Sequence, residues 1–332
     1  MASERETKRS RRDRVLVTGA TGFLGRATAA ALARAGHIVL RGARVAPVGI
    51  GAGTGKEWIS HGDVGPDTHW EEALREISAV VHLAGLSDSL DEPELHRVNA
   101  QGTERLAQAA ASAGVQRLIL VSSAHVHGQA SRGRPFQDGD PPAPETPYAR
   151  SKLDGETRLR EAAASGAMQW VILRSPMVYG PGVDGNFGRL VRLVRAGVPL
   201  PLGAGTAPKS FIGVDNFACA VVRCVEHPRA VNQTFLVADA ETTSTLRLVQ
   251  QIAAALGRRA WTPYVPPLLV RAALAGLGRL RDANRLFDPL ELDTSRIRTL
   301  LDWTPPVSLA EGVRRAVERS AAHSKAGSMG TR

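Results

Sequence analysis

Short apolar runs alternate with amphipathic stretches along the first half of the chain. Six apolar runs are typical of buried strands, and they lie at 14–19, 37–40, 57–64, 79–83, 117–122 and 170–173. Apolar residues recur at helical spacing in the stretches at about 23–35, 69–77, 94–113 and 147–164. Alternation of this kind predicts an α/β fold with a doubly wound parallel sheet that is covered by helices on both faces.

After residue 175 the alternation loosens, which favours a smaller α+β region at the C-terminal side. We expect helices at about 186–196, 214–226 and 246–256, and one strand at 234–237 that returns to the sheet. Pro263, Pro266 and Pro267 break the chain before a last helical region. The predicted division is a basic disordered arm (1–13), a sheet domain (14–175), the smaller region (176–318) and a disordered tail (319–332).

The chain is basic, with 42 Lys and Arg against 32 Asp and Glu and a formal net charge of +10. Part of the excess lies in the N-terminal arm, which could bind nucleic acid or anionic lipid but is explained more simply as a solvated start. Basic and aromatic residues do not interleave, which argues against a nucleic-acid partner. A basic surface also suits an enzyme whose cofactor and substrate are both phosphorylated.

Cysteine use and hydropathy narrow the class further. Cys219 and Cys224 stand five apart in a predicted helix, so we expect buried thiols and no disulfide framework. No apolar run follows the N-terminal charges as in a signal peptide, and the Leu-rich stretch 268–280 is too short to span a bilayer. The sequence therefore predicts a cytoplasmic protein without a membrane span, and it shows no set of metal ligands.

A glycine-rich turn follows the first predicted strand. Residues 18–25 read Thr-Gly-Ala-Thr-Gly-Phe-Leu-Gly, so the three glycines are spaced T-G-x-x-G-x-x-G. Such a turn needs a positive φ, lets a pyrophosphate approach the backbone, and presents helix N–H groups to an anion. We therefore expect residues 14–175 to bind NAD(P), with contacts from Gly19, Thr21, Gly22, Phe23, Leu24 and Gly25.

The end of the second predicted strand bears on the choice between NAD and NADP. An acid there would bind the ribose 2′-hydroxyl, but residues 41–44 read Arg-Gly-Ala-Arg. The guanidinium of Arg44 suits a 2′-phosphate, which slightly favours NADP over NAD. Asp63, after the third strand, is either a contact to the adenine or a turn-forming residue.

Tyr148 and Lys152 are four residues apart in a predicted helix, so their side chains share one face. A phenol with a pKa of about 10 is a poor base at neutral pH, but a nearby ammonium favours the phenolate. Ser123 ends the fifth predicted strand, where its hydroxyl could bond the reacting oxygen. We therefore predict Tyr148, Lys152 and Ser123 as the catalytic group.

These motifs resemble those of the extended short-chain dehydrogenases/reductases. The resemblance rests on the three glycines, Asp63, His82-Leu-Ala84, Asn99, Ser122-Ser123 and Tyr148-x-x-x-Lys152, and on the segments 173–181, 211–216 and 301–305. It spans about residues 14–318 and looks closest to nucleotide-sugar epimerases and 4-keto-reductases, particularly UDP-sugar 4-epimerase-like proteins of polysaccharide pathways.

The resemblance implies a Rossmann-like fold and a reaction at C4 of a UDP-hexose or UDP-N-acetylhexosamine. Tyr148 would exchange the proton at the sugar 4-oxygen, Ser123 would steady that oxygen, and a hydride would pass between C4 and the nicotinamide. A homodimer through the helix that carries Tyr148 is also implied. Further cofactor contacts would come from Val64, Leu83, Ala84, Gly85 and Asn99.

Residues 176–318 would then mainly bind the substrate. Asn186 and Phe187 match nucleotide contacts, and Lys209 matches a phosphate-binding Arg, although a solvated surface lysine is an equal alternative. A second phosphate-binding Arg could be Arg281 or Arg285. His125 is a further candidate contact.

Two departures weaken the UDP-sugar assignment. Met177 stands where a substrate-binding Asn is usual, and His127 replaces a usual Tyr. A reductase or dehydrogenase of a non-sugar ketone or alcohol is therefore one alternative. A non-catalytic NAD(P)-binding regulator is another, but such proteins typically lose the Tyr or the Lys, and this chain keeps both.

Overall fold

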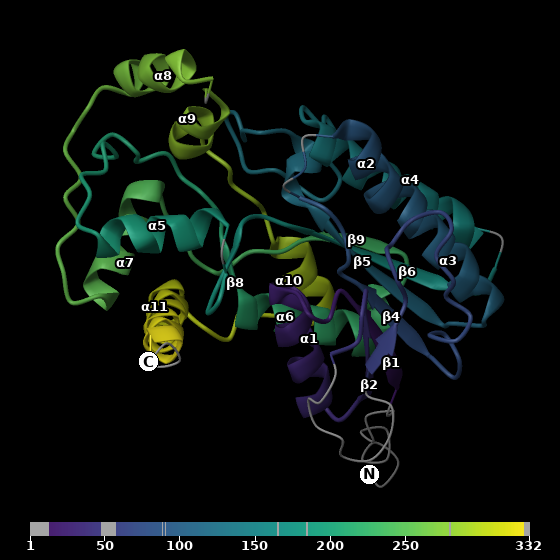
Figure 1. Cartoon of the computed structure of the whole chain (residues 1–332). Coiled ribbons are helices and arrows are strands. Elements are labelled where there is room, and N and C mark those ends of the chain that lie inside the picture. The colour runs from purple at the N-terminus through teal and green to yellow at the C-terminus, as the bar shows by residue number, and fades with distance from the viewer. Residues whose placement is uncertain are drawn as a thin grey trace, which may run out of the picture.

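The computed structural model describes residues 13–47, 58–87, 89, 91–164, 166–183, 185–278 and 280–328, with side chains left out at 280–282 and 319–328. Seven strands form one parallel sheet in the order β3-β2-β1-β4-β5-β6-β9 (Figure 1). The strands are β1 Arg14–Thr18, β2 Ile38–Ala43, β3 Trp58–Ser60, β4 Ala79–His82, β5 Arg117–Ser123, β6 Gln169–Ser175 and β9 Gln233–Leu236. The predicted Rossmann-like α/β fold is confirmed, and β9 returns to the sheet as expected.

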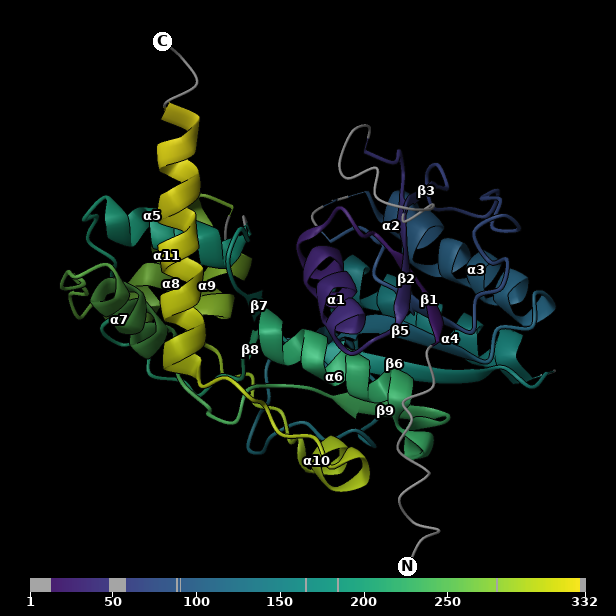
Figure 2. The same cartoon turned by 90° about the horizontal axis from the view of Figure 1, so that it is seen from below.

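Helices cover both faces of this sheet, as Figure 2 shows from below. Side chains alternate along each strand, so Val15 and Val17 of β1 join a core on one face while Leu16 joins a core on the other. The first core includes residues of α1 (Phe23–Arg34) and α6 (Val214–Glu226), and the second includes residues of α3 (Gly102–Ser112) and α4 (Pro147–Ala164). Both faces are therefore buried, which explains the continuous apolar runs in the strands.

The helix expected at 69–77 is wrong, because the structure has only consecutive turns there. Trp70, Leu74 and Ile77 are buried at helical spacing, but the backbone bonds Arg75 N–H to Glu72 O and Ile77 N–H to Leu74 O span three residues. Glu76 then takes a positive φ of 57° and ends the turn. The stretch at 94–113 is divided into α2 Glu92–His96, a π-helical turn Arg97–Gln101 and α3.

The smaller C-terminal region surrounds a core of its own. Its helices are α5 Asn186–Arg195, α7 Thr245–Ala255, α8 Pro267–Gly276, α9 Leu280–Phe287 and α11 Leu309–Ser328, and α10 Ser295–Leu301 packs on β9. A parallel pair, β7 Val178–Tyr179 and β8 Ile212–Gly213, was too short to predict. Two short 3₁₀ turns, Ala124–His127 and Pro228–Ala230, complete the elements.

Helix α11 corrects one predicted boundary. It runs through Ser328, beyond residue 319 where a disordered tail was expected, because Ala and Lys in this stretch favour a helix despite its small polar character. Residues 329–332 and residues 1–12 of the predicted arm lie outside the described residues.

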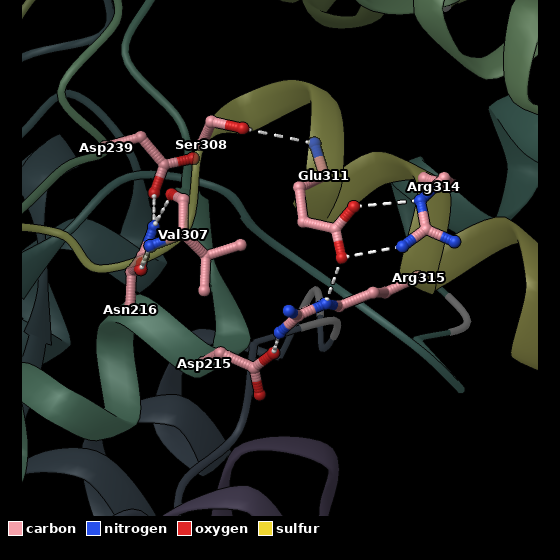
Figure 3. Close-up of polar contacts among 8 residues, drawn as sticks. All are labelled: Asp215, Asn216, Asp239, Val307, Ser308, Glu311, Arg314 and Arg315. Atoms are coloured by element: carbon pink, nitrogen blue, oxygen red, sulfur yellow. Dashed lines mark hydrogen bonds and ion pairs between the residues drawn. The ribbon is translucent and has the colours of Figure 1, made fainter.

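A polar cluster joins α11 to the sheet domain (Figure 3). The Asn216 amide of α6 donates to Asp239 Oδ1 and to Val307 O, each at 2.7 Å, and its oxygen accepts from Val307 N–H at 2.9 Å. Arg315 of α11 pairs with Asp215 at 3.1 Å. These contacts fix the start of α11 against α6, and so hold the smaller region on the sheet.

Two further findings concern membrane-spanning helices and the two cysteines. No helix within the described ranges is long and apolar enough to cross a membrane. Cys219 and Cys224 are free thiols on α6, and burial raises the pKa of Cys224 to about 12. The buried Cys224 thiol therefore stays protonated at neutral pH.

Candidate active site

The glycine turn lies where β1 passes into α1, against the end of β4. Gly19 has φ +65°, and a Cβ there would lie 2.9 Å from Ala84 N. A Cβ on Gly25 would lie 2.1 Å from Gly19 O, so the helix could not approach the turn. Only glycine fits both positions. The spacing that the sequence shows is therefore required by the fold of the turn itself.

The N-terminus of α1 is open to an anion. Gly22 is its N-cap and donates its N–H to Gly19 O at 2.9 Å, and no side chain caps the helix within the described part of the chain. The first turn contains no acidic residue, and Thr21 and Gly22 are exposed. The N–H groups of Phe23, Leu24 and Gly25 have no carbonyl partner in their own helix, so this end fits a pyrophosphate.

Thr18 ties the glycine turn to the segment after β4. Its hydroxyl oxygen accepts from the N–H groups of Leu83 at 3.1 Å and Ala84 at 3.2 Å, and it bonds His82 Nδ1 at 2.8 Å. Burial, and then the charge of Lys152, lower the pKa of His82 to about 3, so this imidazole is neutral. The predicted contacts Leu83 and Ala84 are thus held beside the glycine turn by a hydroxyl that the sequence did not single out.

Asn99 connects the same segment to α4. Its side chain accepts from Leu86 N–H at 2.9 Å and donates to Leu86 O at 2.9 Å and to Ser151 Oγ at 3.0 Å. Ser151 in turn donates to the carbonyl of Tyr148 at 2.9 Å. A Cβ on Gly85 would lie 2.7 Å from Asn99 Oδ1 and 3.9 Å from Lys152 Nζ. Asn99 and Gly85 are therefore neighbours of the predicted catalytic lysine.

The predicted catalytic residues lie on α4 and at the end of β5, which pack together. Lys152 is 8% exposed, and burial lowers its pKa to about 8, although the carboxylate of Glu156 opposes this shift. Ser123 is buried and accepts from His125 N–H at 3.2 Å, and Tyr148 is half-buried at the start of α4. Lys152 therefore keeps most of its charge at neutral pH in a poorly hydrated place, four residues after Tyr148 on the same helix.

Cationic side chains gather beyond Ser123. Lys209 is buried and donates to the carbonyl of Asp288, and burial lowers its pKa to about 8. Burial and the charges of Arg285 and Lys209 lower the pKa of His125, so the three side chains are close enough to interact electrostatically. The Nδ1 atom of His125 is buried and has no hydrogen-bond partner within the described residues. This group is suited to an anionic ligand, and Lys209 is not a solvated surface lysine.

Comparisons with known proteins agree with this geometry. Residues 15–238 match the NAD dependent epimerase/dehydratase family. The chain belongs to that family. The UDP-glucose 4-epimerase of Vibrio cholerae is 36% identical over 312 residues, which cover 92% of this chain and 94% of the relative. The UDP-glucose 4-epimerase of Mycolicibacterium smegmatis is 30% identical over 321 residues, which cover 92% and 97%.

A solved structure resembles the whole chain. MoeE5 in complex with UDP-glucose and NAD superimposes with a TM-score of 0.77 and 27% sequence identity over 93% of this chain and 99% of that one. The family assignment makes the protein an NAD-dependent enzyme of the epimerase/dehydratase type, as its motifs predicted. Within the described residues, no group of three or more His, Cys, Asp or Glu side chains could hold a metal ion.

A buried ion pair behind the site was not predicted. Glu156 of α4 is fully buried and accepts from Arg174 of β6 through Nε at 3.0 Å and Nη2 at 2.6 Å. Ser122 donates its hydroxyl to Glu156 Oε1 at 2.6 Å. Because β5 ends in Ser122 and Ser123, the bond between Ser122 and Glu156 fixes α4 against the strand that carries Ser123. The signal in the sequence was a Glu one turn after Lys152, on the face of α4 that is buried.

The departures from the family pattern are placed as follows. His127 is buried, bonds Arg174 Nη1 through Nε2 at 2.8 Å and stacks on Phe136, and burial with Arg174 lowers its pKa to about 4. It therefore supports the ion pair rather than the substrate. Met177 is half-buried among the apolar side chains of the smaller region.

The two nucleotide contacts predicted on α5 differ in their exposure to solvent. Asn186 is exposed, whereas Phe187 is buried and packs on Tyr179 with ring centroids 5.5 Å apart. The Phe187 side chain therefore serves the core, and a contact to a nucleotide from this residue would come from its backbone. The side chain of Arg281 lies outside the described residues, and Arg285 is the exposed arginine near His125.

The predicted adenosine contacts Arg44 and Asp63 lie together, just after β2 and β3. Arg44 Nε and Asp63 Oδ1 form an ion pair of 2.7 Å, with 74% and 68% of the two side chains exposed. Val64, in contrast, is buried in the core under the sheet. An exposed pair of this kind is weak and can open to a ligand.

Proposed function

We propose that the protein interconverts C4 epimers of a UDP-hexose or UDP-N-acetylhexosamine. The observation that carries the proposal is the pair of cations Lys209 and Arg285 around His125, because His125 is only two residues from Ser123. A substrate whose diphosphate lies on the two cations and whose sugar reaches Ser123 and Tyr148 is a nucleotide sugar. The names of the epimerase relatives support the same substrate class.

The proton chemistry follows from α4. Tyr148 takes the proton from the sugar 4-hydroxyl as C4 is oxidised and returns it when C4 is reduced. Lys152 lowers the pKa of this phenol through its charge, and Ser123 donates a hydrogen bond to the 4-oxygen. NAD(P), held by the glycine turn and Lys152, would supply the hydride acceptor and donor for C4. An epimerase needs both functions in one turnover, whereas a reductase needs only the donor, because its 4-keto sugar arrives ready-made.

The same proposal assigns the binding roles. Gly19, Gly22 and the first turn of α1 hold the pyrophosphate of the cofactor, and Asn99 and Gly85 position Lys152. Arg44 attracts a 2′-phosphate and so favours NADP, and Asp63, which pairs with Arg44 here, contacts the adenine. A homodimer through α4 stays a prediction.

Met177 favours a second candidate, a reductase or dehydrogenase of a non-sugar ketone or alcohol. The thioether is apolar and half-buried among apolar side chains, so it would suit an apolar substrate better than a sugar hydroxyl. Such an enzyme would use Tyr148, Lys152 and Ser123 in the same roles.

One experiment separates these functions. The purified chain is incubated with UDP-glucose, UDP-N-acetylglucosamine and a UDP-4-keto sugar, with catalytic or stoichiometric NAD(P)(H), and the products are identified by NMR. We expect the 4-epimer to form with catalytic cofactor. Stoichiometric oxidation of NAD(P)H by the 4-keto sugar alone would make the protein a reductase, and no reaction with any sugar nucleotide would overturn the proposal.

A further inference from the structure

Helix α8 and the segment before it expose an unusual amount of apolar surface. We call Trp261, Tyr264, Leu268, Leu269 and Leu277 the α8 patch, and their exposed fractions lie between 59% and 76%. Ala272, Ala273 and Ala275 of the same helix are also exposed. So many large exposed apolar side chains within residues 261–277 indicate an interaction site, because single exposed apolar residues are normally scattered.

The arrangement of α8 is inverted relative to an ordinary surface helix. Arg271 is its only charged residue, and it faces inward to pair with Asp288 at 2.5 Å. Val270 is buried and Leu274 half-buried on the same side. The outward side carries no polar side chain at all. A surface helix normally places its polar residues outward, so α8 is built to be covered.

Charge around the patch indicates what covers it. Residues 258–285 contain six arginines and a single acidic residue, Asp282. Arg258 and Arg259 are exposed just before Trp261. Apolar side chains bordered by Trp, Tyr and arginine match the layers of a bilayer surface, where aromatic rings lie at the headgroups and guanidinium groups attract anionic lipid.

We propose that the α8 patch docks on the surface of an anionic lipid bilayer. Helix α8 has 10 residues and is too short to span a bilayer. It therefore lies in the plane of the bilayer surface, with Leu268 and Leu269 among the acyl chains. This inference does not depend on the proposed substrate.

Docking would bring the candidate phosphate site close to the membrane. Asp288 binds Arg271 of α8 through its carboxylate and accepts from Lys209 through its carbonyl. The docking helix is thus bonded through one residue to a cation of the proposed substrate site. A bound bilayer would orient that site toward the lipid surface.

Co-sedimentation with lipid vesicles tests the proposal. The full chain is mixed with vesicles of phosphatidylcholine alone or with about one-third phosphatidylglycerol, at low and high salt. We expect binding to the anionic vesicles, which salt weakens. The double variant Leu268→Glu, Leu269→Glu should bind about a hundredfold more weakly, since burial of each leucine contributes about a factor of ten. Arg259→Glu should weaken binding to anionic vesicles alone.

Ile38→Glu is the matched control, because Ile38 is 56% exposed but lies on β2. It should bind vesicles like the unaltered chain. Failure of the unaltered chain to bind anionic vesicles would overturn the proposal, as would equal binding by the Leu268/Leu269 variant. A dimer in solution that this variant alone dissociates would assign the patch to a second copy instead. Sugar-nucleotide turnover without vesicles should be the same in all these variants, so a failed vesicle test leaves the proposed function standing.

Discussion

Helices α4 and α8 both lie at the surface, yet they distribute charge in opposite ways. On α4 the outward positions Arg150 and Glu161 are exposed, while Lys152 and Glu156 are buried on the inward face. On α8 the outward face is apolar and Arg271 points inward. Each helix departs from the usual amphipathic pattern on one face. On our two proposals, the buried charges of α4 serve chemistry within the molecule, whereas the exposed leucines of α8 serve a contact outside it.

The largest expected effect breaks the chemistry on α4. Tyr148→Phe removes the hydroxyl that moves the proton, so kcat should fall about 10²–10⁴-fold. Cofactor affinity and the unfolding midpoint should change little, because the ring remains. Steady-state kinetics and cofactor fluorescence titration check this. Tyr264→Phe, in the α8 patch, is the matched control, and full activity in Tyr148→Phe would remove the proposed base.

Next in size is the buried pair that holds α4. Glu156→Gln leaves Arg174 buried without its partner, and breaking a buried pair costs about 3–5 kcal/mol of unfolding free energy. Urea denaturation measures this loss. Glu161→Gln, exposed on the same helix, should cost almost nothing.

Glu156→Gln should also shift the pH profile of kcat, which a merely structural role of Glu156 would not do. Glu156 raises the pKa of Lys152, which burial lowers to about 8. Lys152 is charged below this pKa, so activity should fall as the pH rises through about 8. Without the carboxylate the pKa of Lys152 drops further, and the alkaline limb of the kcat profile should move to lower pH. An unmoved limb would show that Glu156 does not act on Lys152.

A smaller effect is expected at the substrate cations. Lys209→Met should raise KM for the sugar nucleotide about 10–100-fold with a lesser change in kcat, because a hydrogen bond to a charged group contributes about 1.5–3 kcal/mol. Since the pKa of Lys209 is lowered to about 8, KM of the unaltered enzyme should also rise above that pH. An unchanged KM at both neutral and alkaline pH would show that no phosphate lies on Lys209.

The smallest effect concerns the exposed pair. Arg44→Ala should weaken the binding of NADPH a few-fold more than the binding of NADH, and high salt should reduce this difference. Equal weakening of both cofactors, measured by titration, would remove Arg44 as a selector for the 2′-phosphate.

Local features of the site could be predicted from the sequence, and long-range ones could not. The glycine turn and the pair Tyr148/Lys152 each lie within one turn or helix, so their spacing alone fixes their geometry. Glu156 and Arg174 are 18 residues apart and meet only because α4 packs on β6. The group of His125, Lys209 and Arg285 needs three separate segments to converge.

One helix was predicted wrongly. Trp70, Leu74 and Ile77 have helical spacing, but one turn ended by a positive φ satisfies it. Phe187 stays a predicted nucleotide contact, and the structure adds that its ring packs in the core of the smaller region. The hydrophobic pattern reports burial correctly in both cases, but it does not distinguish a turn from a helix.

Isotope tracing with UDP-glucose deuterated at C4 tests the central claim most directly. With catalytic cofactor we expect UDP-galactose that retains the deuterium at C4, formed more slowly than from unlabelled substrate. UDP-galactose with hydrogen at C4 would mean that the label exchanges with water and that C4 is not the site of hydride transfer and return. Absence of a C4 epimer from both UDP-glucose and UDP-N-acetylglucosamine, each deuterated at C4, would equally contradict the account.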